Sequence, residues 1–369
     1  MSLSQPFRRR QTISINQLYH TWLQQIRQLW PAERITRLRL MAWFLTGIYL
    51  SRSVQLHRIA GKIPGSAKQV SVTRRLSRFL DNGAVRVRLW YEPVARSLLQ
   101  YLGDTVGEIR LIADGTRIGG KHQLLLISVA YRHRAIPIAW TWIKQARGHS
   151  SAWRQCVLLD YVRRLLPDGV PVLLVGDSEF GAVNVVRQVE AWHWRYVLRQ
   201  TAKELVQVAG QGDWQPFGGL ATQPGTQMWC PCSRFTAKHA HLTNLLIYWQ
   251  IGEKEPWLLI TNLPTAADAV KAYRRRMWTE ELFGDLKSHG FDLQSSHLHH
   301  AARLSRLMLL AAILYLWLVS VGSRAIKAGL RALVDRKDRR DLSLFQIGLR
   351  IIERRLTNAQ HPWMTLQPC

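Results

Sequence analysis

Residues 273–287 read YRRRMWTEELFGDLK, and the interpretation of the whole chain depends on this stretch. On an α-helix, which turns by about 100° per residue, Tyr273, Arg276, Glu280 and Lys287 fall within an arc of roughly 60°. An aromatic hydroxyl, a guanidinium, a carboxylate and an ammonium then share one helix face. A solvated stripe bridged by the i,i+4 pair Arg276 and Glu280 explains this pattern without any function. A catalytic or binding face explains it too, so the rest of the chain has to decide.

The charge of the chain indicates a polyanionic partner. Lys and Arg number 51 against 24 Asp and Glu, which gives the 369 residues a formal charge of +27. A soluble protein keeps such an excess when it binds nucleic acid or an acidic surface. Sixteen Trp residues add planar groups that can stack on bases. Nucleic acid is therefore the favoured partner, and an anionic membrane surface is the alternative.

Three features bear on the compartment. Residues 1–10 carry charge without a following apolar run, so no secretory signal is expected. The uncharged stretch 307–323 is at the short limit for a membrane span, and we interpret it as a buried core helix rather than a membrane segment. The four Cys residues form no disulfide framework and fit a reducing cytoplasm.

Residues 1–107 are predicted to form a helical, basic domain. Apolar residues recur there at helical spacing with Arg and Lys between them. Ser71 or Thr73 can cap a helix that carries Arg74, Arg75 and Arg78. A short basic helix after a turn fits a helix-turn-helix reader or a phosphate clamp, and a bundle helix with a solvated basic face fits equally well.

From residue 108 the pattern changes to that of an α/β layer. Two apolar β-leaning runs, 123–131 and 135–143, are joined by Arg132-His133-Arg134 and predict a hairpin. The other predicted elements are strands at 109–113, 170–175 and 194–198 and helices at 153–166 and 182–190. After them come a β-rich insertion at 201–262, a helix at 270–289, an apolar helix at 301–321, the exposed basic sequence RALVDRKDRRD and a helix at 342–356.

Asp114 and Asp177 stand at the ends of two predicted buried strands. Ligands of α/β sheets gather at the carboxyl ends of strands, although an Asp there is often only a turn or cap residue. Together with Glu280 they provide three carboxylates, which suit two divalent metal ions about 4 Å apart for phosphoryl transfer. Oxygen ligands favour Mg²⁺ or Mn²⁺. Arg276 and Lys287 would then hold the phosphates.

A second candidate metal site is independent of the carboxylates. Cys230 and Cys232, with His239 and His241, place two ligand types on each of two predicted strands. A hairpin between them could build a tetrahedral zinc site, and ordinary strand residues are the alternative.

The stretch quoted first resembles the Y-R-E-K signature of DDE-type insertion-sequence transposases of the insertion-sequence-four group. That signature is Tyr, two residues, Arg, three residues, Glu, six residues and Lys. Tyr273, Arg276, Glu280 and Lys287 match every step, and Phe283 supplies the usual E-x-x-F.

The resemblance implies an α/β fold: a ribonuclease-H-like catalytic core interrupted by the β-rich insertion, with an all-helical N-terminal DNA-binding domain and a helical C-terminal tail. Asp114, Asp177 and Glu280 become the catalytic and metal-binding triad, and Trp257 matches a Trp that stacks on a base flipped out beside the cut. The expected layout is a DNA-binding domain at 1–107, catalytic core at 108–200 and 263–322, insertion at 201–262, and a basic helical region at 323–369.

The expected function is that of a transposase in the bacterial cytoplasm, associated with the nucleoid. It would bind the terminal inverted repeats of its own element as a homodimer on double-stranded DNA. With two Mg²⁺ ions it would nick the DNA, form and reopen a hairpin, and join the 3′ ends to target DNA. The alternative is a catalytically inactive DNA-binding protein, either a decayed copy or an inhibitor of transposition.

Overall fold

The computed structural model describes residues 5–118, 122–144, 150–287 and 289–369. These residues form two compact units. Unit 1 comprises the described residues of Met1–Tyr101, Ile118–His122 and Phe283–Cys369. Unit 2 comprises Leu102–Arg117 and the described residues of Gln123–Leu282. The unit boundaries fall within the helices α5 (Val87–Val106) and α9 (Trp278–Leu286) and at the ends of the strands β1 (Ile109–Ile118) and β2 (His122–Tyr131).

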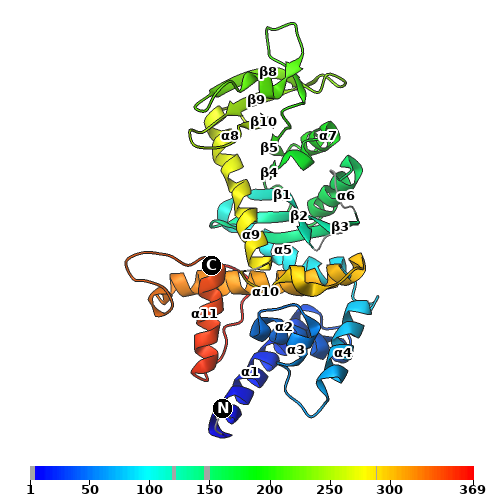
Figure 1. The fold of residues 1–369 in the computed structure, drawn as a ribbon, viewed down its shortest axis with the longest axis vertical. Coiled ribbons are helices and arrows are strands. Elements are labelled where there is room, and N and C mark those ends of the chain that lie inside the picture. The colour runs from blue at the N-terminus through cyan, green and yellow to red at the C-terminus, as the bar shows by residue number, and fades with distance from the viewer. Residues whose placement is uncertain (1–4, 119–121, 145–149, 288) are drawn as a thin grey trace. The chain divides into compact units, whose positions relative to one another are not determined.

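Unit 2 is built on one sheet, which has ten strands in the described residues (Figure 1). Their order across the sheet is β3-β2-β1-β4-β5-β10-β9-β8-β6-β7. The strands are β1 (Ile109–Ile118), β2 (His122–Tyr131), β3 (Arg134–Lys144), β4 (Val172–Gly176), β5 (Arg195–Arg199), β6 (Leu205–Gln207), β7 (Gln215–Pro216), β8 (Gln227–Phe235), β9 (His241–Tyr248) and β10 (Trp257–Thr261).

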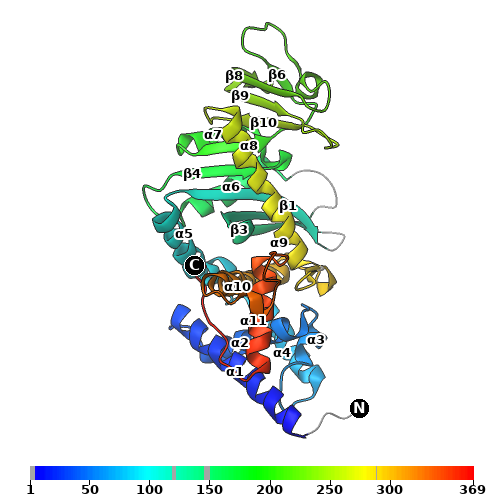
Figure 2. The ribbon, with the colours of Figure 1, turned by 90° about the vertical axis from the view of Figure 1, so that its left-hand side faces the viewer.

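The centre of this sheet is parallel and covered on both faces. Strand β4 pairs in parallel with β1 and with β5, and all five of its residues are buried. The helices α6 (Ala152–Arg163) and α7 (Val183–Ala191) cover one face, and α8 (Ala266–Tyr273) covers the other (Figures 1 and 2). A parallel strand without a solvated face has to be apolar on both sides, which is why β4 reads VLLVG. The predicted α/β layer is confirmed.

The predicted hairpin is also confirmed, with a tight turn between β2 and β3. Arg132 and His133, the two residues between these strands, have φ values of 42° and 64°. Two central residues with positive φ are typical of the turns that match the right-handed twist of paired strands.

Strands β6 to β10 come from the segment predicted as a β-rich insertion. They extend the central sheet, because β10 pairs antiparallel with β5 at one edge and with β9 at the other. Strand β10 comes long after Asp177 in the sequence, and its pairing with β5 holds it directly beside the parallel strands.

Unit 1 is helical. Besides the adjoining parts of α5 and α9, its helices are α1 (Gln5–Leu29), α2 (Ile35–Ser51), α3 (Leu56–Ala60), α4 (Gln69–Asp81), α10 (Ala301–Lys327) and α11 (Leu344–Thr357). Short 3₁₀ segments of the two units lie at Ser178–Phe180, Phe217–Leu220, Arg274–Met277, Leu293–Ser296 and Arg331–Leu333.

Helix α10 forms the centre of unit 1. Among the described residues it is the one helix long and apolar enough to cross a membrane, yet 89% of its most apolar window is buried inside the protein. Trp317, near its middle, is fully buried, and its Nε1 donates to the carbonyl oxygen of Trp363 at 2.7 Å. The interpretation of 307–323 as part of a buried core helix is confirmed.

Helix α4 begins earlier than its predicted cap. The helix starts at Gln69, and its N-cap residue, Lys68, makes no side-chain cap. The prediction of Ser71 or Thr73 as the cap is therefore wrong. Both lie inside the first turns of the helix, where the Thr73 hydroxyl donates to the carbonyl oxygen of Gln69 at 2.9 Å. A Thr hydroxyl inside a helix can donate to the carbonyl oxygen four residues earlier instead of capping the helix.

Helices α10 and α11 cross at a pair of glycines, and their ribbons pass close together in both views (Figures 1 and 2). A Cβ atom added to Gly322 would lie 1.9 Å from the carbonyl oxygen of Leu344. A Cβ atom added to Gly348 would lie 1.9 Å from the carbonyl oxygen of Leu318. Only the absence of a side chain at both positions lets the two backbones come this close.

We predict that Gly348→Ala lowers the free energy of unfolding by about 2 kcal/mol or more, because the new methyl group meets backbone rather than a flexible side chain. Thermal and urea unfolding followed by circular dichroism will measure the change. Gly83→Ala is the matched control, since a Cβ atom there meets nothing within 4 Å. Equal stability of the two variants would contradict the close helix crossing.

Candidate active site

The Y-R-E-K stretch is not the single helix predicted over 270–289. Helix α8 ends at Tyr273, a 3₁₀ turn covers Arg274–Met277, and α9 begins at Trp278. The Thr279 hydroxyl lies 2.7 Å from the carbonyl oxygen of Arg276 and stabilises this tight turn. A 3₁₀ turn has three residues per turn, so it rotates the following residues away from the α-helical arc. Lys287 follows the last residue of α9.

Two carboxylates lie side by side at the parallel centre of the sheet. The β1–β4 pairing ends at Ala113 opposite Gly176, and Asp114 and Asp177 are the next residues of the two chains. Neighbouring strands are about 4.8 Å apart, so the two side chains start from adjacent positions. Strand β1 itself runs on to Ile118. Asp114 therefore stands where the parallel pairing ends and not, as predicted, where the strand ends.

Arg276 connects the first carboxylate to the third. Its Nη2 donates to Asp114 Oδ1 at 3.4 Å, and its Nε lies 3.2 Å from Asp114 Oδ2. Its Nη1 lies 3.2 Å from Glu280 Oε1. The i,i+4 pair of Arg276 and Glu280 considered above is thus only one of two contacts. The same guanidinium also neutralises Asp114, a buried acid on β1.

Asp114 is almost completely enclosed, with 1% of its side chain exposed. Besides Arg276, it accepts hydrogen bonds from the Thr279 hydroxyl and from the amide of Gly115, the latter at 2.8 Å. Sequence reasoning assigns no role to Thr279. Its position three residues after Arg276 is the only sequence signal that could have identified it.

Burial raises the pKa values of both aspartates. Burial raises the pKa of Asp114, against the opposing effects of Arg276 and of the two hydrogen bonds. Burial, and then repulsion from Asp114, raise the pKa of Asp177 to about 7. Two neighbouring carboxyl groups that resist ionisation together form a site that favours added positive charge.

A fourth acid, Glu179, supports the turn after β4. Its buried side chain accepts from Gln123 Nε2 at 2.6 Å and from the amide of Ser150 at 2.8 Å. Its own amide donates to Asp177 Oδ1 at 3.1 Å. A Cβ atom added to Gly115 would lie 2.7 Å from Glu179 Oε2, which explains the glycine after Asp114. Glu179 therefore positions the backbone beside both aspartates.

The donor chemistry of this site fits divalent metal ions. Asp114, Asp177 and Glu280 offer only carboxylate oxygens, which are the ligands of Mg²⁺ and Mn²⁺. In the arrangement of the described residues, no three His, Cys, Asp or Glu side chains converge on one point. Arg276, rather than Glu280, lies against Asp114, and 54% of the Glu280 side chain is exposed. Glu280 would have to approach the aspartates to complete a three-carboxylate site.

Aromatic side chains line the neighbouring part of unit 2. The ring centroids of Trp257 and Tyr273 are 5.0 Å apart, and those of Tyr248 and Trp257 are 5.5 Å apart. Tyr273 is buried, which raises its pKa to about 12 and keeps its hydroxyl protonated at neutral pH. Arg274 Nη2 lies 3.4 Å from the Tyr248 hydroxyl.

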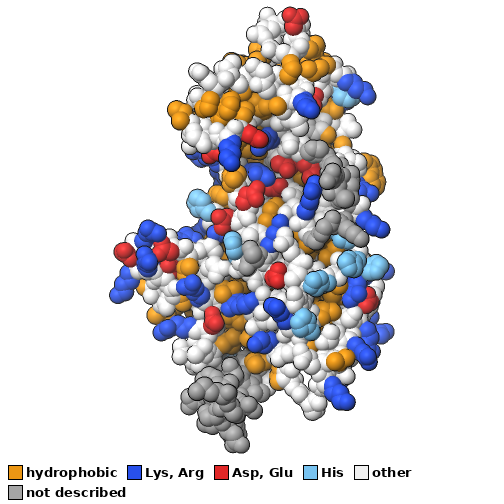
Figure 3. Space-filling model, in the orientation of Figure 1, with side chains coloured by type: hydrophobic (Ala, Val, Ile, Leu, Met, Phe, Trp, Pro, Cys, Tyr) orange, Lys and Arg blue, Asp and Glu red, His pale blue; other side chains and the backbone are white. Residues whose placement is uncertain are grey.

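The remaining predicted DNA contacts belong to unit 1. Arg74, Arg75 and Arg78 all lie exposed on α4, whose opposite face buries Leu76 and Phe79. Lys287 also belongs to unit 1, and its ammonium lies 5.9 Å from the centre of the Phe283 ring. In the space-filling view, Lys and Arg side chains are spread over the surface, and the fewer Asp and Glu side chains lie among them (Figure 3).

The sequence left open whether Cys230, Cys232, His239 and His241 bind zinc. In the described structure Cys230 is buried, Cys232 is exposed, and the strand is irregular between Cys230 and Ser233. His241 Nε2 lies 3.0 Å from Glu190 Oε2. These residues form no candidate metal cluster in the part of the chain that is described.

Comparison with known proteins identifies the family of the chain. The family model described as the transposase DDE domain matches residues 110–317, which include the two aspartates and Glu280. The chain therefore belongs to the DDE transposase family, an enzyme family that acts on DNA and uses divalent metal ions.

Similarity beyond the family model is limited. No curated protein matches the chain significantly. Among solved structures, the cryo-EM structure of the piggyBac transposase synaptic complex with hairpin DNA aligns with a TM-score of 0.44 and 12% sequence identity. The alignment covers 94% of this chain and 77% of that one.

The raised pKa of Asp177 predicts a pH-dependent cost in stability. Its pKa of about 7 exceeds the ordinary 3.8, so the folded protein favours the protonated form. The stability of the folded protein that depends on protonated Asp177 is fully present below about pH 4 and is lost as the pH rises through about 7. Asn at this position cannot ionise. The free energy of unfolding of Asp177→Asn, relative to that of wild type, should therefore be more than about 1 kcal/mol higher at pH 8 than at pH 5.

Urea unfolding in EDTA at the two pH values will measure this gain. Asp213→Asn is the matched control, because Asp213 is exposed on the surface of unit 2. If both variants show the same difference from wild type at pH 5 and at pH 8, the crowding of the two buried aspartates is not as described.

Proposed function

We propose that this protein is a cut-and-paste transposase of the insertion-sequence-four group, with Asp114, Asp177 and Glu280 as its catalytic triad. The observation that carries the proposal is the adjacency of Asp114 and Asp177 at the end of the β1–β4 pairing, with Arg276 connecting Asp114 to Glu280. The enzyme would nick one strand, attack the opposite strand to form a hairpin, reopen it and join the 3′ ends to target DNA.

The chain's own residues have distinct tasks in this reaction. The three carboxylates would hold two Mg²⁺ ions, for which Mn²⁺ could substitute, and the chemistry so supplied is activation of the attacking oxygen and stabilisation of the leaving oxygen. Arg276 would move from the carboxylates towards a phosphate beside the cut, since a guanidinium matches either group with paired hydrogen bonds. The Tyr273 hydroxyl would donate a hydrogen bond to a phosphate, and Lys287 would supply a further positive charge.

We assign Trp257 to a base flipped out beside the cut. Its half-buried indole stands next to Tyr273, and a base stacked on an aromatic ring gains about 1–3 kcal/mol. This contact would offset part of the cost of unpairing the base during hairpin formation.

We further propose a ribonuclease-H-like core made of β1 to β5 within residues 108–200 and completed by 263–322. The strand order β3-β2-β1-β4-β5, with Asp114 on the first strand and Asp177 after the fourth, supports it. The helices of residues 1–107 would bind the terminal inverted repeats, and two copies would work on paired ends of double-stranded DNA. A bacterial cytoplasm and association with the nucleoid fit the four free cysteines and the charge of +27.

Removal of a catalytic carboxylate should abolish cleavage without affecting DNA binding. We expect Asp114→Asn and Glu280→Gln to slow Mg²⁺-dependent nicking by a factor on the order of 10³ or more, because each removes a charge that holds metal. The assay uses a labelled duplex carrying the element's terminal repeat, with Mg²⁺ or EDTA. Glu281→Gln is the matched control, since Glu281 pairs with Arg134 at 3.1 Å instead of facing the aspartates.

Two results would redirect the proposal. Normal nicking by Asp114→Asn would remove the triad assignment. Tight end binding by the wild type without cleavage in any metal would instead favour an inactive DNA-binding protein.

The exposed arginines of α4 should contribute to recognition of the ends. We expect the triple variant Arg74→Ala, Arg75→Ala, Arg78→Ala to weaken binding of the terminal repeat by 10-fold or more, on the order of 0.5 kcal/mol for each arginine replaced. Electrophoretic mobility shifts with the terminal repeat and with a scrambled duplex measure both affinity and specificity. An equal affinity for variant and wild type would leave α4 as a bundle helix with a solvated basic face.

A further inference from the structure

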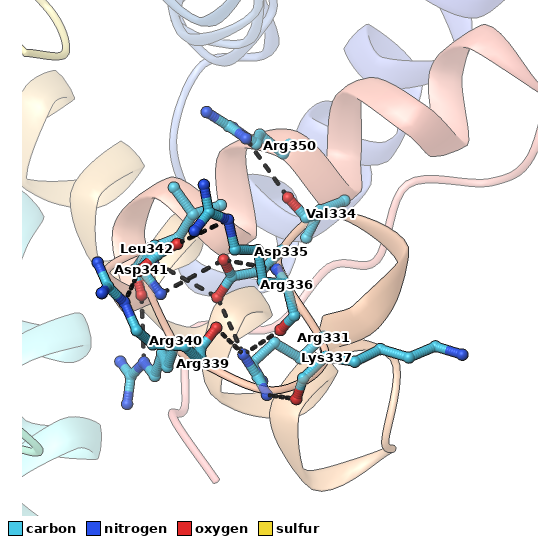
Figure 4. Close-up of polar contacts among 10 residues, drawn as sticks. All are labelled: Arg331, Val334, Asp335, Arg336, Lys337, Arg339, Arg340, Asp341, Leu342 and Arg350. Atoms are coloured by element: carbon cyan, nitrogen blue, oxygen red, sulfur yellow. Dashed lines mark hydrogen bonds and ion pairs between the residues drawn. The ribbon is translucent and has the colours of Figure 1, made fainter.

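The basic sequence between α10 and α11 is folded. We call residues 331–342, RALVDRKDRRDL, the basic loop. The sequence predicts an exposed tail here, and the loop's charged side chains are indeed mostly exposed. Its backbone, however, is organised around one arginine, Arg331, as the close-up shows (Figure 4).

Arg331 holds the loop together by donating hydrogen bonds to its backbone carbonyl groups. Its Nη1 donates to the carbonyl oxygens of Arg336 at 2.7 Å and Arg339 at 3.0 Å. Its Nη2 donates to the carbonyl oxygen of Lys337 at 2.8 Å. The guanidinium also pairs with Asp335 at 3.2 Å, and only 24% of the Arg331 side chain is exposed. One side chain thus replaces the backbone pairing that a regular element would supply.

Asp335 completes the centre of the loop. Only 2% of its side chain is exposed, and besides Arg331 it accepts hydrogen bonds from the amides of Arg336 at 2.9 Å and of Asp341 and Leu342, both at 3.4 Å. The Arg331–Asp335 pair, which we call the clasp, therefore fixes both ends of the loop. Charge-assisted hydrogen bonds of this kind are among the stronger ones in proteins.

The clasp has a consequence for the outer cations. Because the carbonyl groups of Arg336, Lys337 and Arg339 point inward, their side chains are left outside. The exposed fractions of the Arg336 and Arg339 side chains are 70% and 75%, and Lys337 extends away from the hydrogen-bonded centre (Figure 4). Asp341 is an anion near both arginines, at 3.2 Å from Arg336 and 2.6 Å from Arg339. Exposed ion pairs are worth little, so phosphates can readily replace Asp341.

We propose that the basic loop is a preformed contact for the sugar-phosphate backbone of duplex DNA, additional to the catalytic site and to α4. The proposal rests on the proposed function only in taking DNA as the ligand. A flexible basic tail loses conformational entropy when it binds, whereas this loop is already ordered by the clasp. Its cations reach phosphates and no base-specific arrangement is fixed, so the contact is independent of sequence.

The first test removes the outer cations and leaves the clasp intact. The variant Arg336→Ala, Lys337→Ala, Arg339→Ala is compared with wild type for binding a labelled duplex of arbitrary sequence over a series of salt concentrations. The slope of log K against log salt should fall in magnitude by about 2–3, because each phosphate contact contributes about 0.9. The control Lys203→Ala, Lys238→Ala, Lys254→Ala removes the same charge from exposed sites of unit 2 and should change the slope less.

The second test separates preorganisation from simple charge. Asp335→Asn keeps every cation and raises the net charge by one, but weakens the clasp. Attraction by charge alone predicts tighter binding of the duplex, whereas a preformed loop predicts weaker binding. We expect the variant to bind several-fold more weakly, with nicking at saturating DNA unchanged from wild type.

Several outcomes would overturn the proposal. An unchanged slope in the outer-cation variant would exclude the loop as a DNA contact, and tighter binding by Asp335→Asn would exclude the role of the clasp. Loss of binding to phosphatidylserine vesicles with an unchanged DNA slope would assign the loop to a membrane. If the wild type itself bound no duplex, the transposase proposal would fail, which is a different result from failure of the loop alone.

Discussion

The burial of Asp114 is the constraint on which the arrangement of unit 2 depends. A carboxylate with 1% of its side chain exposed is costly to ionise unless hydrogen bonds and a cation surround it. Gly115, Thr279 and Arg276 supply these partners. Two of the three come from the segment after α8, so that segment has to turn towards β1. The 3₁₀ turn at Arg274–Met277 is the local geometry with which the chain does so.

This constraint explains what the sequence could and could not predict. Strands β1 to β5, the β2–β3 hairpin and the buried α10 follow from apolar periodicity and turn residues, and these were predicted, whereas the short strands β6 and β7 were not. The spacing of Tyr273, Arg276, Glu280 and Lys287 also indicated a DDE transposase, which is the family that the family model shows. A helix projection, however, assumes one regular helix, and the contact of Arg276 with a strand more than 150 residues earlier breaks that regularity. Tertiary contacts of this kind leave no periodic signal.

Backbone proximity was equally hidden from the sequence. Gly322 and Gly348 read as helix-weakening residues, yet they permit the contact between α10 and α11. Gly115 likewise makes room for Glu179, which in turn accepts hydrogen bonds from β2 and from the start of the segment leading into α6. In each case the missing side chain matters because of a partner far away in the chain, and single-sequence patterns describe only near neighbours.

The distribution of charge links the site to its substrate. The neighbouring carboxylates of Asp114 and Asp177 would repel a phosphate backbone, while a net charge of +27 attracts one from every side. Arg276 meets both requirements, because its guanidinium neutralises the buried carboxylate of Asp114 and also matches a phosphate with paired hydrogen bonds. Arg331 has a related role in unit 1, where it donates to carbonyl groups of the basic loop and so holds that loop in one shape. In both units, then, an arginine that is mostly shielded from solvent fixes the local geometry of the backbone or side chains around it.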